Sequence, residues 1–139
     1  MDKVYVPFDR VMVSEHLWLS EVRCHCGAPV CARSMQLPDP SVVGLFESLR
    51  WALGVPLLVS CCGRCVKHNA AVGGHPNSLH LLLAALDVCI PRGKSEYVVF
   101  NFADKIVGDG GLGRYPGRGF IHIDAGHLLG LPSRRRWEK

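Results

Sequence analysis

Residues 77–90, NSLHLLLAALDVCI, place a histidine and an aspartate inside an otherwise apolar stretch. On one continuous helix, His80 and Asp87 would share a face but would lie two turns, or about 10 Å, apart. Metal–ligand bonds are only ~2 Å long, so side chains held that far apart would share one metal ion poorly. If the chain turns back after Leu83, the two side chains can converge. The pair can therefore act together only if the chain reverses direction within this stretch.

A second stretch, GFIHIDAG, alternates apolar and polar residues as a β-strand does. In a strand, Phe120, His122 and Asp124 share one face. His122 then adds an imidazole to the pair formed by His80 and Asp87. Two imidazoles and one carboxylate leave the fourth position of a zinc ion open for water, which is the arrangement of a catalytic zinc site. We therefore predict one bound zinc ion (Zn2+) as a cofactor.

The clearest helix is predicted for LPDPSVVGLFESLRWALGVP. Ser41 or Asp39 can cap its first turn, and Gly54 and Pro56 end it. Its apolar residues recur at helical spacing: Val42, Leu45, Phe46, Leu49 and Leu53. The residues that follow, PLLVS (56–60), predict a short buried strand.

Three other stretches carry weaker signals. CCGRCVKHNAAVGGHPN (61–77) is expected to be a long polar loop, and ordered loops of that length tend to carry function. SEYVVFNFADKIVGDGG favours a strand by its β-branched and aromatic content, or a helix capped by Ser95. GDGGLGRYPG (108–117) is expected to form turns, because neither a helix signal nor a Lys-Ser/Thr pair follows it as in a phosphate loop.

The chain has 139 residues, with 48% hydrophobic and 20% charged residues, which is typical of one globular domain. We predict a single domain over 1–139, with its core at about 14–137. The formal net charge of +4 arises largely in a basic C-terminal tail, 133–139, which we expect to be solvated. The alternative use of such a tail is binding to an anionic polymer.

The N-terminus, MDKVYVPFDR, has no apolar segment of the kind found in secretory signal peptides. No apolar run approaches the ~20 residues that span a bilayer, so no membrane partner is expected. The sequence therefore predicts a protein that is cytoplasmic as synthesised, and association with a phage or virus is compatible with it. Basic residues are scattered and aromatic residues are few, which argues against a nucleic-acid partner. The sequence indicates no oligomeric state.

Seven cysteines are present, an odd number, and without an export signal we expect no full disulfide framework. Two spacings are typical of metal ligands, Cys24-x-Cys26 and Cys62-x-x-Cys65. They leave two interpretations open: a second, structural zinc site, or reduced thiols that fill gaps in the core.

Several motifs occur in a fixed order along the chain. CCGRCVKHNAAVGG contains an arginine, a His-Asn pair and a Gly-Gly pair. SLHLLLAALD contains S-x-H and A-x-D, GFIHID contains H-x-D, and RRRW comes near the end. Over about residues 14–137, this series resembles the M15 zinc D,D-peptidases, especially the small D-Ala-D-Ala carboxypeptidase-like branch. The matching residues are Arg64, His68, Asn69, Gly73, Gly74, Ser78, His80, Ala85, Asp87, His122, Asp124, Arg136 and Trp137.

The resemblance implies an α+β fold of the hedgehog/D-Ala-D-Ala-peptidase type, with a small, mainly antiparallel sheet and packed helices. It implies that His80, Asp87 and His122 are the zinc ligands. The first two would lie on adjoining extended segments, strand-turn-strand. Arg64 would stabilise the oxyanion that forms when water attacks the amide, and Ser78 would help to bind the substrate. The implied substrate is a peptidoglycan stem peptide or another small peptide, cleaved at a D-Ala-containing amide bond by a carboxypeptidase or endopeptidase.

The chain departs from the family pattern at several positions. The acidic general base often lies three residues before the third ligand, and this chain has Gly119 there. Asp124 is the nearest local candidate for the base, or else a residue that orients His122. The S-G-Y before the arginine is Cys-Cys-Gly63, and the glycine of H-x-x-G is Leu83, which would cost about 1–2 kcal/mol at a positive φ. The alternative function is therefore a catalytically decayed zinc-binding domain that acts as a binding or structural module.

Overall fold

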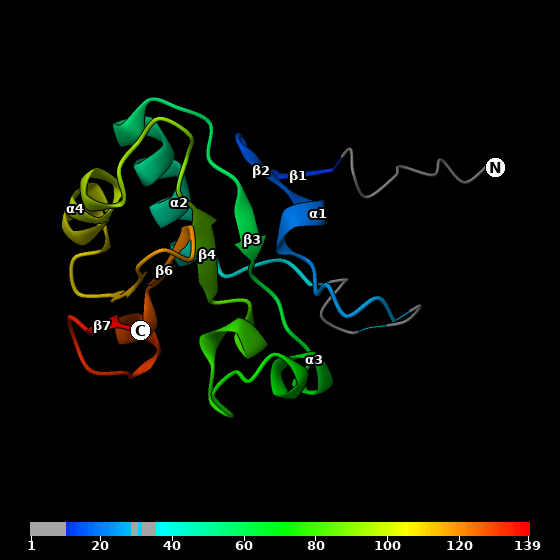
Figure 1. Ribbon diagram of the computed structural model, residues 1–139. Helices are drawn as coiled ribbons and strands as arrows, with labels where there is room; N and C mark the ends of the chain where they lie inside the picture. The colour runs from blue at the N-terminus through cyan, green and yellow to red at the C-terminus, as the bar shows by residue number, and fades with distance from the viewer. Residues whose placement is uncertain (1–10, 29–30, 32–35) are drawn as a thin grey trace.

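The structure is a computed structural model that describes residues 11–28, 31 and 36–139 (Figure 1). Two short strands and a single helical turn come first: β1 (Met12–Ser14), β2 (Leu17–Trp18) and α1 (Leu19–Val22). The main body follows: α2 (Pro40–Leu53), β3 (Val59–Cys61), α3 (Val66–Ala71), the 3-10 helix η3 (Leu79–Leu82), β4 (Ala85–Cys89), α4 (Glu96–Val107), β5 (Gly111–Tyr115), β6 (Phe120–Asp124), the 3-10 helix η4 (Gly126–Leu129) and β7 (Arg136–Glu138).

The centre of the fold is a five-stranded sheet in the order β3-β4-β6-β5-β7. Neighbouring strands are antiparallel except β5 and β7, which run parallel. Figure 1 shows α2 and α4 together on one side of this sheet, while α3 lies beyond the end of β3. This architecture confirms the predicted α+β fold with a small, mainly antiparallel sheet.

Helix α2 forms where the apolar spacing predicts it. The side chain of Asp39 accepts a hydrogen bond from the backbone N–H of Ser41 (2.9 Å), and Pro40 occupies the first turn. Gly54 ends the helix with a φ of 67°. The buried face packs into the core through Val42, Phe46, Leu49 and Leu53.

The ambiguous stretch after residue 94 is a helix, α4. Ser95 accepts a hydrogen bond from the N–H of Val98 (3.1 Å), so the capping signal decides the structure over the strand signal. Val99, Ala103 and Val107 recur four residues apart on its buried face. In the part of the chain that the structure describes, no helix is both long and apolar enough to cross a membrane.

Three predictions of local structure are wrong or incomplete. The expected loop over 61–77 contains helix α3, which Cys65 caps by accepting the N–H of His68. The predicted strand 56–60 is shifted to Val59–Cys61, and Leu58 beside it is exposed. The expected turns over 108–117 include strand β5, between β6 and β7. A side chain at Gly113 would overlap the ring of Trp137, so glycine lets β7 approach there.

The basic C-terminal segment is solvated only in part, because residues 135–137 are half-buried while its other residues are exposed. Arg136 begins strand β7, which pairs with β5, and its guanidinium contacts Asp104 of α4 (Nε to Oδ1, 2.7 Å). The same side chain donates to the carbonyls of Gly108 (2.6 Å) and Gly110 (2.8 Å). Because these contacts occupy its hydrogen-bond donors, Arg136 connects the edge strand β7 to α4 and is not available to an anionic polymer.

Candidate metal centre

The site forms where β4 and β6 lie side by side. Asp87 pairs directly with His122 in the register of the two strands. Before β4, the chain makes the 3-10 helix η3, and Leu83 then turns it with a φ of 52°. This reversal after Leu83 confirms the predicted turn and brings His80 back onto Asp87. The predicted strand around His80 is wrong, because that residue lies in η3.

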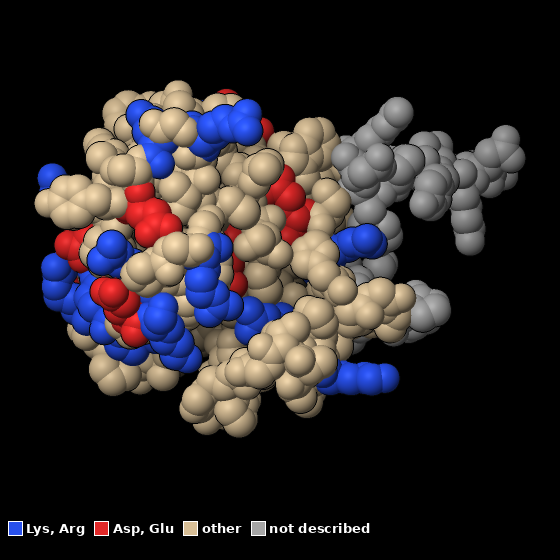
Figure 2. All heavy atoms as spheres, viewed as in Figure 1, with Lys and Arg blue, Asp and Glu red and all other residues tan. Residues whose placement is uncertain are grey.

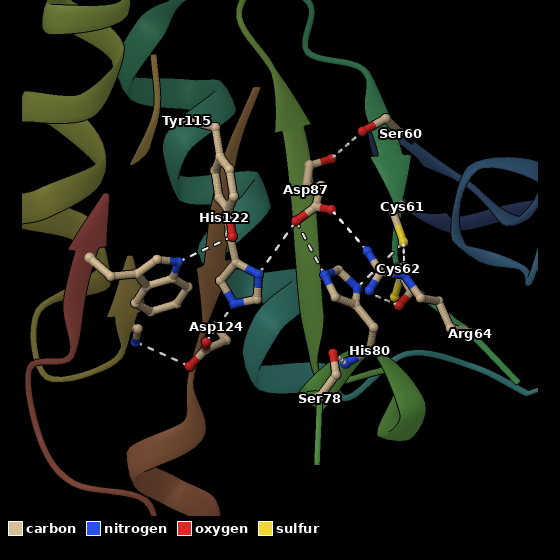
Figure 3. A network of polar contacts seen from close by, with 12 residues as sticks. Ser60, Cys61, Cys62, Arg64, Ser78, His80, Asp87, Tyr115, His122 and Asp124 are labelled. Carbon is tan, nitrogen blue, oxygen red and sulfur yellow. Dashed lines mark hydrogen bonds and ion pairs between the residues drawn. The ribbon is translucent and has the colours of Figure 1, made fainter. Parts of the chain in front are cut away.

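Two imidazoles flank one carboxylate oxygen in the cluster (Figure 3). The Oδ1 atom of Asp87 lies 3.2 Å from Nε2 of His80 and 3.4 Å from Nδ1 of His122. All three residues are buried. Ligand atoms with ~2.0–2.1 Å bonds to a tetrahedral zinc ion lie ~3.3 Å apart, so each of these two separations from Asp87 is that of two neighbouring ligand atoms on one ion.

Cys61 offers a second set of ligand atoms with the same two residues. Its Sγ atom, a nitrogen of His80 and an oxygen of Asp87 all lie within 4.8 Å of one another. Sequence reasoning assigned no role to Cys61, which ends β3 directly before the buried Cys62. His80 and Asp87 are therefore common to both possible sets, and His122 or Cys61 completes them.

The hydrogen bonds of the two histidines fix which nitrogen faces Asp87. Nδ1 of His80 donates to the carbonyl of Cys62 (2.8 Å), because a carbonyl can only accept. Nε2 of His122 donates to Oδ2 of Asp124 (2.6 Å). In the neutral imidazoles, the nitrogens left with a lone pair both point at the centre of the cluster. This is the way in which metal-binding histidines are usually held.

Asp124 is fully buried, and its carboxylate is surrounded by donors. Besides His122, it accepts the backbone N–H groups of Gly111 (3.1 Å) and Gly126 (2.8 Å), and it pairs with Arg135. Burial alone raises the pKa of Asp124, but these donors hold that pKa below its usual value. The arrangement favours the orienting role over the role of general base, because both carboxylate oxygens already accept hydrogen bonds and the residue is fully buried.

At the centre of the cluster, the protonation of His80 and that of Asp87 depend on each other. Burial alone lowers the pKa of His80, but Asp87 and Cys61 outweigh it and raise that pKa to about 10. Burial alone raises the pKa of Asp87, but the hydrogen bonds from the two histidines hold it well below its usual value. The cluster therefore stabilises a positive charge beside Asp87. A metal cation would take the place of the proton and release it.

Arg64 reaches the cluster from the segment between β3 and α3. Its guanidinium donates to Sγ of Cys61 (3.2 Å) and to Oδ1 of Asn69 (3.3 Å), and it lies 3.5 Å from Oδ2 of Asp87. Asn69 is buried and also donates to the carbonyl of His75 (3.0 Å). Through these contacts, Asn69 holds the guanidinium against the cluster.

An open cleft of about 460 Å³ lies over the cluster. Ser78 lines it and caps η3, where its Oγ accepts the N–H of His80 (3.3 Å). The lining also includes Arg118, whose guanidinium lies over the rings of Tyr115 (5.4 Å) and Phe120 (5.5 Å). Figure 2 shows basic side chains gathered over the region of β7 and the C-terminus. The cleft therefore offers cationic and aromatic groups beside the histidines.

Sequence reasoning missed the aromatic support of His122. The ring of Trp137 lies 4.9 Å from that of His122, and its indole N–H donates to the hydroxyl of Tyr115 (3.1 Å). Trp137 belongs to the motif series, but its position beside His122 depends on the parallel pairing of β7 with β5. Since two strands far apart in sequence make this contact, only the tertiary fold reveals it.

Two imidazoles and a carboxylate at the floor of an open cleft, with a guanidinium beside them, form the donor set of a metal-dependent hydrolase. Residues 15–124 match the family described as Peptidase M15. The chain therefore belongs to the peptidase M15 family, and its function is of the metallopeptidase type. No curated protein matches the chain.

Two of the departures from the family pattern are in contact with each other. The pattern that the chain resembles has tyrosine at position 63 and glycine at position 83. Here a Cβ atom at Gly63 would lie 3.2 Å from Cγ of Leu83, so the leucine covers the glycine. Leu83 is 1% exposed and belongs to the main core. Leu83 therefore packs against the backbone of Gly63 beside the metal centre.

Leu83→Gly should destabilise the protein although it removes backbone strain. Leucine at this φ costs about 1–2 kcal/mol, whereas loss of a buried leucine side chain costs about 2–5 kcal/mol. We expect a net loss of about 2 kcal/mol in the free energy of unfolding, measured by denaturant titration. The matched variant Leu83→Ala loses the packing and keeps the strain, so it should be less stable still. A Leu83→Gly protein as stable as the wild type would show that the relieved strain offsets the lost packing here, contrary to this expectation.

Proposed function

We propose that the protein is a zinc peptidase that hydrolyses D-Ala-containing amide bonds of peptidoglycan stem peptides, as a carboxypeptidase or an endopeptidase. The observation that carries the proposal is the convergence of His80, Asp87 and His122 under an open cleft, with Arg64 at 3.5 Å from Asp87. Membership of the peptidase M15 family supports the class of reaction.

In this proposal, His80, Asp87 and His122 hold the zinc ion. A zinc ion held there would supply a Lewis acid that lowers the pKa of water toward ~7. The two histidines are held for this task by the carbonyl of Cys62 and the carboxylate of Asp124, which fix their tautomers. Burial of all three residues keeps bulk water from competing with them.

Arg64 is proposed to bind the oxygen that gains negative charge as the amide is attacked. Its guanidinium is permanently charged and planar, and Asn69 and Cys61 hold it in place before substrate arrives. Donors fixed in advance stabilise a developing oxyanion without a reorganisation cost. The present contact of Arg64 with Asp87 orients the guanidinium toward the reacting centre.

The cleft walls favour a short peptide that ends in a carboxylate. Arg118 and Lys139 both line the cleft, and either can pair with the terminal carboxylate of a stem peptide. Ser78 lies on the same wall as His80, and its hydroxyl can donate to a substrate carbonyl while its oxygen caps η3. The apolar faces of Tyr115 and Phe120 suit small alanine methyl groups.

The proposal is tested by turnover of matched peptides. Zinc-loaded protein should release alanine from a peptide ending in D-Ala-D-Ala, or cleave cross-linked muropeptides, and the products are identified by mass spectrometry. The same peptide ending in L-Ala-L-Ala should remain intact. Turnover of the L-peptide alone would contradict the assigned substrate class.

One observation favours a second candidate, a decayed zinc-binding domain that acts as a binding or structural module. The two carboxylates that line the cleft, Asp87 and Asp124, are both engaged by neighbouring groups, and position 119 holds a glycine. A protein that binds zinc but turns over neither D-Ala-D-Ala peptides nor muropeptides would establish this candidate.

Asp124→Asn should weaken zinc binding by about 10–100-fold, because Asp124 orients His122 through the hydrogen bond to its Nε2. Zinc affinity is measured by competition with a chromophoric chelator. If Asp124 were the general base, zinc affinity would stay near the wild-type value. The pH–rate profile would then lose its acidic limb instead.

A further inference from the structure

Four cysteines form a second group of metal-type ligands, separate from the histidine–aspartate cluster. Three of them follow α1, and the fourth caps the N-terminus of α3. Their Sγ atoms all lie within 4.8 Å of one another: Cys24, Cys26, Cys31 and Cys65. Four sulfurs around a tetrahedral zinc ion, with bonds of ~2.3 Å, lie ~3.8 Å apart. The four thiols are therefore grouped almost as closely as a shared ion requires.

Backbone donors already point at two of these sulfurs. The N–H of Cys65 lies 3.3 Å from Sγ of Cys24, and the N–H of His68 lies 3.3 Å from Sγ of Cys65. A neutral thiol is a weak acceptor, whereas a thiolate accepts strongly. Donors placed around the sulfurs therefore suit the charged form that metals bind.

Three of the cysteines lie in the segment that follows α1. Between Arg23 and Gln36, the described residues include no helix or strand. Among those residues, the buried side chains are Cys24 and Cys31. Small segments that cannot bury an apolar core are commonly held by a metal or by disulfides, and none of the seven cysteines forms a disulfide here.

We propose that Cys24, Cys26, Cys31 and Cys65 bind a structural zinc ion as four thiolates. Four protein ligands close the coordination sphere, which is the form of structural and not catalytic zinc sites. The spacing Cys62-x-x-Cys65 wrongly pointed to Cys62, which lies in the apolar core, and it missed Cys31. Cys65 directly follows Arg64, which contacts the histidine–aspartate cluster. The ion would therefore link the segment after α1 to the chain beside that cluster.

Metal analysis of matched variants tests the site, and it does so independently of the proposed peptidase activity. In a His80→Ala, His122→Ala background, the reduced protein should still contain one zinc ion per chain. Adding Cys26→Ser or Cys65→Ser should remove that ion. Adding Cys89→Ser should leave it, because Cys89 lies at the end of β4 outside the cluster.

Cobalt substitution keeps the test decisive if the serine variants fail to fold. A Cys61→Ala protein, which removes the thiol beside the histidine–aspartate cluster, should show an intense near-ultraviolet thiolate-to-cobalt charge-transfer band when loaded with Co2+, as the wild type does; nitrogen and oxygen ligands do not give this band. Cys26→His should keep the ion and weaken that band. Absence of the band in the Cys61→Ala protein, iron in place of zinc, or recovery of these four cysteines as disulfides would each overturn the proposal.

Discussion

Arg64→Ala should lower the rate of peptide hydrolysis by about 10²–10³ while the protein keeps its fold and its zinc. That is the usual scale for removal of one donor to a developing oxyanion. The guanidinium contacts Cys61, Asn69 and Asp87, and it contributes no metal ligand, so its loss should act on the transition state. Steady-state kinetics with zinc-loaded protein, together with metal analysis of the same sample, measures both effects.

Two variants serve as comparisons for Arg64→Ala. Arg92→Ala removes an exposed arginine from the turn after β4 and should leave the rate unchanged. Arg64→Lys keeps the charge but lacks the planar fork that Cys61 and Asn69 hold, so it should recover little of the rate. If Arg64→Ala lost zinc in proportion to its activity, the arginine would support the metal centre and would have no separate role in the reaction.

Removal of any one ligand of the histidine–aspartate cluster should abolish hydrolysis and strip that cluster of its zinc. His80→Ala, Asp87→Ala and His122→Ala each leave two of the three protein donors, too few to retain the ion against a chelator. Zinc per chain is measured by elemental analysis after dialysis, with any ion held by the cysteine cluster counted separately. His16→Gln, at a histidine that pairs with Glu47, is the control and should keep all metal.

Cys61→Ala decides between the two ligand sets that the structure offers. If His122 completes the set, Cys61→Ala should keep the zinc of the cluster and His122→Ala should lose it. The reverse result would make Cys61 the third ligand and would contradict the assignment of His122.

The part of the site that lies on β6 has the arrangement that the alternating sequence predicts. Alternation in GFIHIDAG placed His122 and Asp124 on one face of β6, and the structure joins their side chains at 2.6 Å. The polar pair in an apolar stretch required a reversal after Leu83, and Leu83 makes it. Both signals are local in the chain, because they depend only on the period of a strand and on the length of a helix turn.

The missed features depend on contacts between distant segments. The residues of β5 were predicted to form turns, since glycines are common in turns. In the structure, Gly113 leaves room for the ring of Trp137 to pack against the strand. The C-terminal basic segment looked solvated because nothing in its own sequence reveals Asp104 and the carbonyls that receive Arg136. Likewise, Cys31 joins Cys65 only through the fold, so spacing alone selected the wrong partner, Cys62.

The most direct test of the central claim is zinc titration of the chelated protein while hydrolysis of a D-Ala-D-Ala peptide is followed. Metal-free protein should be inactive, and the rate should rise with the zinc bound by His80, Asp87 and His122, reaching its maximum when that cluster holds one ion per chain. Full activity in the metal-free protein, or no activity in the fully loaded protein, would contradict the account.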